Sequence, residues 1–88
     1  STFFCADGLG GTITLPAASS WNGLKLTFVV DMTSRVAKNP DKYKATNYFC
    51  GLAGAYNNIT ELSMARPYML EMIAFNNHWY ITRMDLVS

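Results

Sequence analysis

The sequence is poor in charged residues, and their signs nearly cancel. Asp, Glu, Lys and Arg make up 15% of the 88 residues, against about 25% in a typical soluble domain. Seven Lys and Arg face six Asp and Glu, for a net charge of +1. The bulk positive charge of a nucleic-acid coat is therefore missing, and we expect no nucleic-acid partner. A small domain has much surface for its volume and would ordinarily be polar, so we expect other subunits to cover part of this surface.

Cysteine and histidine are also scarce. Cys5 and Cys50 are the only cysteines, and His78 is the only histidine. These three residues cannot complete a four-ligand zinc site of cysteine and histidine. We expect two buried thiols; a Cys5–Cys50 disulfide is the alternative, and it would need an oxidising environment. His78 follows a turn signal, so we expect an exposed turn residue rather than a metal ligand or a pH switch. No metal and no cofactor are expected.

Long hydrophobic runs are absent. No stretch approaches the roughly 18 apolar residues of a membrane-spanning helix, and residues 1–7 lack the basic region and apolar run of a signal peptide. We expect no membrane partner. Half of the residues are nevertheless hydrophobic and 14% are aromatic, which argues against disorder. The chain is expected to fold as one domain over residues 1–88.

Short segments of alternating polarity predict an all-β fold. The clearest strand lies over residues 24–31, where Leu24, Leu26, Phe28 and Val30 share one face. Further β-type segments cover residues 3–5, 12–16, 48–54, 59–64, 68–75 and 78–84. Turn signals separate them, and no stretch of helical periodicity is present. We predict a small β-sandwich or barrel of about six to eight short antiparallel strands.

The last two β-type segments predict a hairpin. Residues 68–75 are apolar on both alternating faces apart from Glu71, and Asn76 and Asn77 then join them to residues 78–84. Two turn-competent residues between two strands are typical of a β-hairpin. Trp79 follows this turn, where its indole can close one end of a sandwich while its N–H donates to a carbonyl.

Two stretches lie outside the strand pattern. Residues 34–44 hold the only concentration of basic side chains, with Arg35, Lys38, Lys42 and Lys44. Pro40 argues against a continuous helix there, so we expect a long loop. Residues 1–10 combine the apolar start Phe3-Phe4-Cys5 with the glycine-rich Gly8-Leu9-Gly10. They are expected to form an N-terminal arm on a flexible hinge, with Phe3 and Phe4 as its anchors.

Three segments resemble, in the same order, a module of tailed-bacteriophage virion proteins. They are Gly-Thr-Ile-Thr-Leu-Pro-Ala-Ala-Ser-Ser over residues 11–20, Thr27-Phe28-Val29, and the strand–turn–strand over residues 69–81 that contains Trp79-Tyr80-Ile81. The resemblance covers about half of the chain. Residues 32–62 are longer and more basic than the short turns of the module.

The resemblance implies a structural β-domain of the kind found in tail fibres, head fibres and capsid-associated proteins, which are often trimeric. It implies no enzymatic activity, because the matched residues belong to the core and the turns, such as Pro16, Phe28 and Trp79. The sequence itself shows no set of nucleophile, base and orienting group. We expect that the protein is not an enzyme.

The first hypothesis is a capsid decoration (cement) protein. It would form a homotrimer on the capsid surface of a virion assembled in the host cytoplasm, and it would bind the major capsid protein or another virion protein. We expect the arm and the basic loop to contact the shell, through Phe3, Phe4, Arg35, Lys38, Lys42 and Lys44. Toward a sibling subunit we expect Met69, Glu71 and Ile73, with Arg66 or Arg83 as the ion-pair partner of Glu71.

Two alternatives stay open. One is a tail- or head-fibre domain that binds a host receptor. The other is a free-standing, lectin-like binding module. In the fibre domain, exposed aromatic side chains such as Trp21, Tyr43 and Tyr56 would stack on sugar.

Overall fold

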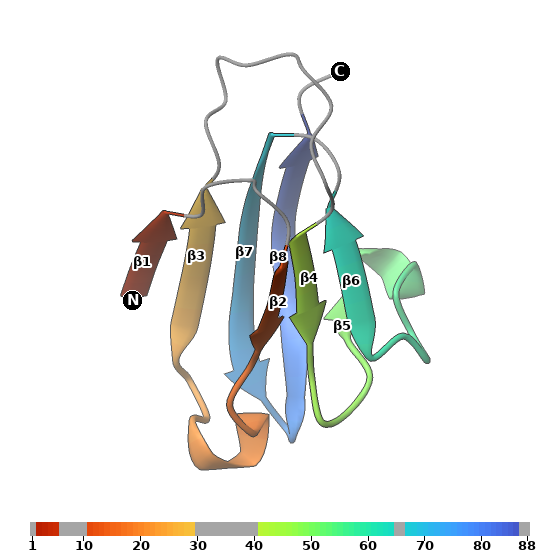
Figure 1. Cartoon of the computed structure of the whole chain (residues 1–88). Coiled ribbons are helices and arrows are strands. Elements are labelled where there is room, and N and C mark those ends of the chain that lie inside the picture. The colour runs from red at the N-terminus through yellow and green to blue at the C-terminus, as the bar shows by residue number, and fades with distance from the viewer. Residues whose placement is uncertain (1, 6–10, 30–40, 65–66, 87–88) are drawn as a thin grey trace.

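Two facing β-sheets make up the fold in a computed structural model of the chain (Figure 1). The structure describes residues 2–5, 11–29, 41–64 and 67–86. Five strands form one sheet in the order β1-β3-β7-β8-β5, and three form the other in the order β2-β4-β6. The strands are β1 (Thr2–Cys5), β2 (Gly11–Thr14), β3 (Lys25–Val29), β4 (Asp41–Lys44), β5 (Cys50–Gly51), β6 (Glu61–Met64), β7 (Tyr68–Phe75) and β8 (His78–Leu86); the 3-10 turns are η1 (Ala18–Ser20) and η2 (Leu52–Gly54). The all-β prediction is confirmed, and over the described ranges the two open sheets close into no barrel.

The sheets are mixed, whereas we expected antiparallel strands throughout. β1 runs parallel to β3, β2 to β4 and β5 to β8, while the pairs β3/β7, β7/β8 and β4/β6 are antiparallel. From β1 to β7, successive strands alternate between the two sheets (Figure 1). A chain that crosses to the other sheet and returns can place its next strand parallel to the one it left. Turn signals along the sequence carry no information about such crossings.

The predicted β7–β8 hairpin is confirmed. Ile73 pairs with Tyr80, and Phe75 pairs with His78 beside the turn. Asn76 and Asn77 adopt φ values of 49° and 67°, the left-handed region that a two-residue type I′ turn requires and that Asn tolerates well. The ladder shifts register between Glu71 and Met72, so Thr82 on β8 is the extra residue of a β-bulge.

The core lies between the two sheets and follows the predicted alternation. Leu26 and Phe28 of β3 are buried, as are every second residue of β7 and the indole of Trp79. Trp79 Nε1–H donates to the carbonyl oxygen of Pro16 at 2.9 Å, which confirms the predicted closure of the sandwich end. The buried hydrophobic residues are Leu15, Ala18, Leu26, Phe28, Tyr43, Phe49, Leu62, Met64, Tyr68, Leu70, Met72, Ala74, Trp79 and Ile81.

A strand occupies part of the expected basic loop. Residues 41–44 form β4, in which Asp41 and Tyr43 are buried and Lys42 and Lys44 are exposed. The loop prediction was wrong here, because a four-residue strand that begins after Pro40 and carries two lysines resembles a charged loop in sequence. The rest of that segment, with Arg35 and Lys38, lies outside the described residues.

A chain of hydroxyl groups joins the two sheets within the core. Tyr68 on β7 donates its hydroxyl hydrogen to Asp41 Oδ2 on β4 at 3.2 Å. Its oxygen also contacts the Tyr43 hydroxyl, which is then the donor. Burial raises the pKa of Tyr43 to about 12 and, together with the Tyr43 hydroxyl, raises the pKa of Tyr68. Both tyrosines are therefore neutral donors near neutral pH.

The two cysteines stand on opposite edge strands of the larger sheet. Cys5 ends β1 and Cys50 begins β5, with β3, β7 and β8 between them. At about 4.8 Å per strand spacing, the four spacings alone separate their Cα atoms by roughly 19 Å, whereas a disulfide needs less than about 7 Å. The alternative of a Cys5–Cys50 disulfide within one chain is therefore excluded. The thiol of Cys50 is free and half-buried, not fully buried as we expected.

The expected N-terminal arm is partly a strand of the same chain. The backbone of Thr2–Cys5 pairs in parallel with β3, placing Phe3 opposite Thr27 and Phe4 opposite Phe28. This stretch is an edge strand rather than a projecting arm, because pairing with β3 satisfies its backbone hydrogen bonds locally. Residues 6–10 lie outside the described residues.

Gly51→Ala is expected to destabilise the fold strongly. A Cβ at this position would lie 2.3 Å from the carbonyl oxygen of Ile81, at a φ of +97°. Gly23→Ala is the matched control, since Gly23 has a similar φ of +90° but open space around it. We expect a loss of more than about 3 kcal/mol in the free energy of unfolding for Gly51→Ala, and about 1–2 for the control. Equal losses in urea unfolding would contradict the clash.

Tyr68→Phe is expected to cost more stability than Tyr43→Phe. The first change removes the donor to Asp41 and the acceptor of Tyr43 together, whereas the second removes only the terminal donor. We expect losses of about 2–3 and about 1 kcal/mol, respectively. Chemical denaturation of the two variants at neutral pH checks the order, and the reverse order would show that the hydroxyl chain has another direction.

Candidate functional site: the outer face of the five-stranded sheet

The outer face of the five-stranded sheet is its surface away from the second sheet. Because side chains alternate along a strand, residues between the buried ones of β7 point to this surface. Strand register brings neighbours from β3 and β8 beside them, so Ile73 lies between Lys25 and Tyr80. The face comprises Lys25, Thr27 and Val29 of β3, Met69, Glu71, Ile73 and Phe75 of β7, and His78, Tyr80, Thr82, Arg83 and Asp85 of β8.

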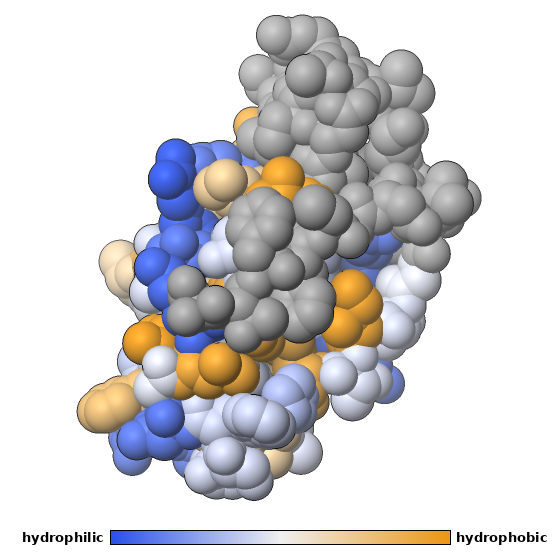
Figure 2. All heavy atoms as spheres, turned by 90° about the vertical axis from the view of Figure 1, so that its left-hand side faces the viewer, coloured by the Kyte–Doolittle hydropathy of each residue, from blue (hydrophilic) through white to orange (hydrophobic). Residues whose placement is uncertain are grey.

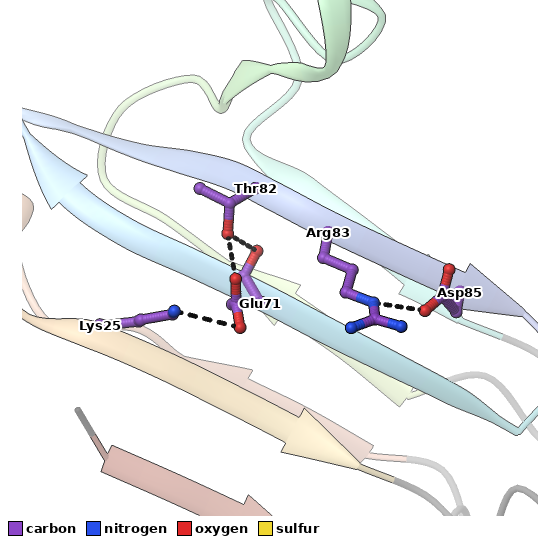
Figure 3. Close-up of polar contacts among 5 residues, drawn as sticks. All are labelled: Lys25, Glu71, Thr82, Arg83 and Asp85. Atoms are coloured by element: carbon purple, nitrogen blue, oxygen red, sulfur yellow. Dashed lines mark hydrogen bonds and ion pairs between the residues drawn. The ribbon is translucent and has the colours of Figure 1, made fainter.

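Glu71 forms the polar centre of this face (Figure 3). Its Oε1 accepts a hydrogen bond from Thr82 Oγ1 at 2.9 Å, and its Oε2 lies 3.3 Å from Lys25 Nζ. Thr82 is the bulge residue, and the bulge turns its hydroxyl toward Glu71. The Thr82 hydrogen bond, and then Lys25 and Arg83, hold the pKa of Glu71 below its usual 4.5. The carboxylate is thus ionised and satisfied within its own chain.

Within the chain, Glu71 pairs with Lys25 rather than with Arg83. Arg83 donates instead from Nε to Asp85 Oδ2 at 2.6 Å (Figure 3), and it acts on Glu71 only through its charge. Arg66 lies outside the described residues. The hydrophobic pattern could not reveal the partner, since Lys25 belongs to a strand distant in sequence. Alternation did predict that Glu71 lies on the outer face between Met69 and Ile73.

An aromatic cluster occupies the end of the face beside the β7–β8 turn. The rings of Tyr48 and His78 pack at a tilt of 40° with centroids 4.3 Å apart, and Phe75 meets Tyr80 edge-on at 5.9 Å. His78 Nδ1–H donates to the backbone carbonyl of Tyr48 at 2.9 Å. His78 is therefore half-buried and held in place rather than an exposed turn residue. Phe75, by contrast, keeps 57% of its surface exposed.

The remaining sequence-predicted candidates lie elsewhere. Lys42 and Lys44 are exposed on the outer face of the three-stranded sheet, and Lys42 Nζ lies 3.9 Å from Glu61 Oε1. The structure therefore places these lysines on the opposite side of the sandwich from Met69, Glu71 and Ile73.

The three aromatic residues proposed to stack on sugar differ in how exposed they are. Trp21 is 50% exposed. Tyr43 is fully buried, so that prediction was wrong: its alternation with lysines turns it into the core. Tyr56 is half-buried, and its hydroxyl donates to Met84 Sδ at 3.1 Å. In the part of the chain that the structure describes, no three potential metal ligands come together.

The core reaches the surface at the side of the sandwich. A hollow of about 400 Å³ opens between β6 and β8, lined mainly by Tyr56, Ile59, Leu62, Met64, Met84 and Leu86. On the side of β1 and β3, hydrophobic residues form a band with hydrophilic residues on either side of it (Figure 2). Apolar surface is thus spread around the sandwich rather than gathered in one deep cleft.

Searches against known proteins add no relative. No protein-family model, curated protein or solved structure matches the chain. Within the described residues, no helix is long and apolar enough to cross a membrane.

Glu71→Gln is expected to reduce stability in a pH-dependent way. A carboxyl group whose pKa is lower in the folded than in the unfolded state stabilises the fold at pH values above its unfolded pKa. This contribution disappears as the pH falls through the folded pKa. The wild type should therefore be more stable than Glu71→Gln at pH 7, with the difference shrinking below about pH 4.5. Urea unfolding from pH 7 to pH 3 measures it.

Glu61→Gln is the control for this experiment, since its ion pair with Lys42 is longer and lies between exposed side chains. We expect little change from it at any pH. A difference for Glu71→Gln that stays constant down to pH 3 would contradict the role given to its charge.

Proposed function

We propose that the protein is a non-enzymatic structural protein of a tailed-phage virion, namely a capsid decoration protein that acts as a homotrimer on the outer shell. Two things support this. Segments of the sequence resemble a virion β-module, and the outer face of the five-stranded sheet offers apolar side chains around charges already paired inside the chain. The second observation carries the proposal.

The outer face suits contact with a sibling subunit. Met69 and Ile73 flank Glu71 on β7, and both are half-buried before any partner is added. Methionine adapts its shape to a facing surface. Because Glu71 already binds Lys25 and Thr82, covering it leaves no carboxylate without a partner, which is the main penalty of burying a charge. No salt bridge between subunits is needed.

The size of such a contact is sufficient for a decoration protein. A contact that buries roughly 800 Å², about 60% of it apolar, contributes on the order of 12 kcal/mol before ordering and association costs. Repetition over many copies on a shell then adds avidity. Each single contact can be modest while the shell as a whole resists internal pressure.

The outer face of the three-stranded sheet remains available for contact with the capsid shell. Lys42 and Lys44 are exposed on the outer face of the three-stranded sheet, so they stay accessible when the five-stranded sheet meets a sibling. Exposed lysines favour an acidic facing surface, and the major capsid protein would supply it. Self-association and shell binding then use different surfaces of one subunit.

A fibre domain that binds a host receptor is the second candidate. The exposed rings of Trp21 and Phe75 favour it, because exposed aromatic rings are common in ligand-binding surfaces. Copy number per particle separates the two functions. A decoration protein is present in hundreds of copies and a fibre in few, and quantitative mass spectrometry of purified particles measures the ratio to the major capsid protein.

The native mass of the purified chain tests the trimer. We expect light scattering after size exclusion to give about three times 9.8 kDa. Ile73→Asp is expected to shift the population to monomers, because it places a third carboxylate on the outer face beside Glu71 and Asp85. Thr12→Asp, at an exposed position of the other sheet, is the matched control. A monomer at all concentrations, or a trimer unaffected by Ile73→Asp, would contradict the proposal.

A further inference from the structure

A second hollow lies at the end of the sandwich, where the β7–β8 turn meets the loop before β3. It is a shallow hollow of about 410 Å³, open to solvent and lined by Ser19, Asn22, Phe75, Asn76 and Asn77. This volume falls within the range of small-molecule sites. The hollow shares Phe75 with the outer face of the five-stranded sheet and lies apart from the lysines of the other sheet. The inference does not depend on the proposed function.

We propose that this hollow is a binding site for a neutral carbohydrate. None of its five lining residues is charged, so the site lacks the opposite charge that would favour a phosphate, a carboxylate or a cation over a neutral ligand. Amide and hydroxyl groups both donate and accept hydrogen bonds. They match the hydroxyl groups of a sugar, which do the same.

The polar groups of the hollow are free to bind a ligand. Among the described residues, the side chains of Ser19, Asn22, Asn76 and Asn77 have no hydrogen-bond partner. A ligand therefore has no existing protein contact to displace. The turn at Asn76 and Asn77 depends on their positive φ values and not on their side-chain amides. The fold itself therefore does not explain why three amides and one hydroxyl surround this hollow.

Phe75 supplies the apolar surface that a sugar ring needs. It is 57% exposed, the largest exposure among the large hydrophobic residues of the described chain. Its ring meets Tyr80 edge-on at 5.9 Å, and more than half of the residue's surface stays open to solvent. One side of a pyranose ring presents C–H groups, and such groups pack on the negative face of an aromatic ring.

The two parts of the hollow are held together before a ligand arrives. Gly23 N–H donates to the carbonyl of Ala74 at 2.7 Å, and Ala74 N–H donates to the carbonyl of Leu24 at 2.9 Å. These bonds tie the loop that carries Asn22 to the strand that carries Phe75. Asn76 and Asn77 sit on a tight two-residue turn. Little backbone entropy is therefore lost on binding, which favours affinity.

Titration of the full-length 15N-labelled chain with maltoheptaose, cellohexaose, chitotetraose and a mannose oligomer tests the site by NMR. We expect at least one sugar to shift the side-chain amide signals of Asn22, Asn76 and Asn77, with a dissociation constant in the micromolar to low millimolar range. A sulfated heparin oligosaccharide is the charged comparison, and it should shift none of them.

Matched variants separate binding from folding. Asn76→Gly with Asn77→Gly removes both amides, while glycine keeps the positive φ of the turn. Phe75→Ala removes the ring at an exposed position. We expect each variant to weaken sugar binding by about tenfold or more, and Ile59→Ala, outside the hollow, to leave it unchanged.

Three outcomes would overturn the inference: no shift from any neutral sugar up to about 10 mM, shifts confined to other residues, or unchanged affinity in Phe75→Ala. Binding of heparin alone would overturn it too. None of these outcomes bears on the trimer, which is measured without sugar.

Discussion

The contact of Tyr43 with the opposite sheet is the interaction on which the sandwich depends. Tyr43 is fully buried and packs against Phe28 at 4.7 Å and Tyr68 at 6.0 Å, both from the five-stranded sheet. β2, β4 and β6 have only four residues each, so their small sheet depends on its hydrophobic face being packed against the larger sheet. The ring of Tyr43 supplies the apolar contact between the sheets. Its hydroxyl, through Tyr68 and Asp41, supplies a polar link with a defined direction.

The alternation of the chain between the sheets decides where function can reside. Because the sheets cover each other's inner faces, what remains are two outer faces and the two ends. The outer face of the five-stranded sheet is broad and partly apolar, and the Glu71 cluster neutralises its centre. The hollow at the end with the β7–β8 turn is lined by uncharged polar residues and by the exposed ring of Phe75. Both proposals therefore rest on surfaces of the sandwich rather than on its interior.

Sequence reasoning succeeded where a local pattern has only one structural solution. It predicted the inward face of β3, the apolar residues on both faces of β7, the Asn76-Asn77 turn and the indole hydrogen bond of Trp79. It failed where the outcome depends on a distant neighbour. Lys25 as the partner of Glu71 follows from the pairing of β3 with β7, and the hydroxyl of Thr82 reaches Glu71 only through the bulge.

The sequence by itself determined that the fold is all-β, which residues of its longer strands face inward, and where the last hairpin turns, because alternation and left-handed turns act over a few residues. Only the tertiary structure decided the parallel pairings, the strand at Asp41–Lys44, the burial of Tyr43 and the distance between Cys5 and Cys50. Strand order is settled by which hydrophobic faces cover each other best. That choice involves the whole chain at once, so no short stretch of the sequence carries it.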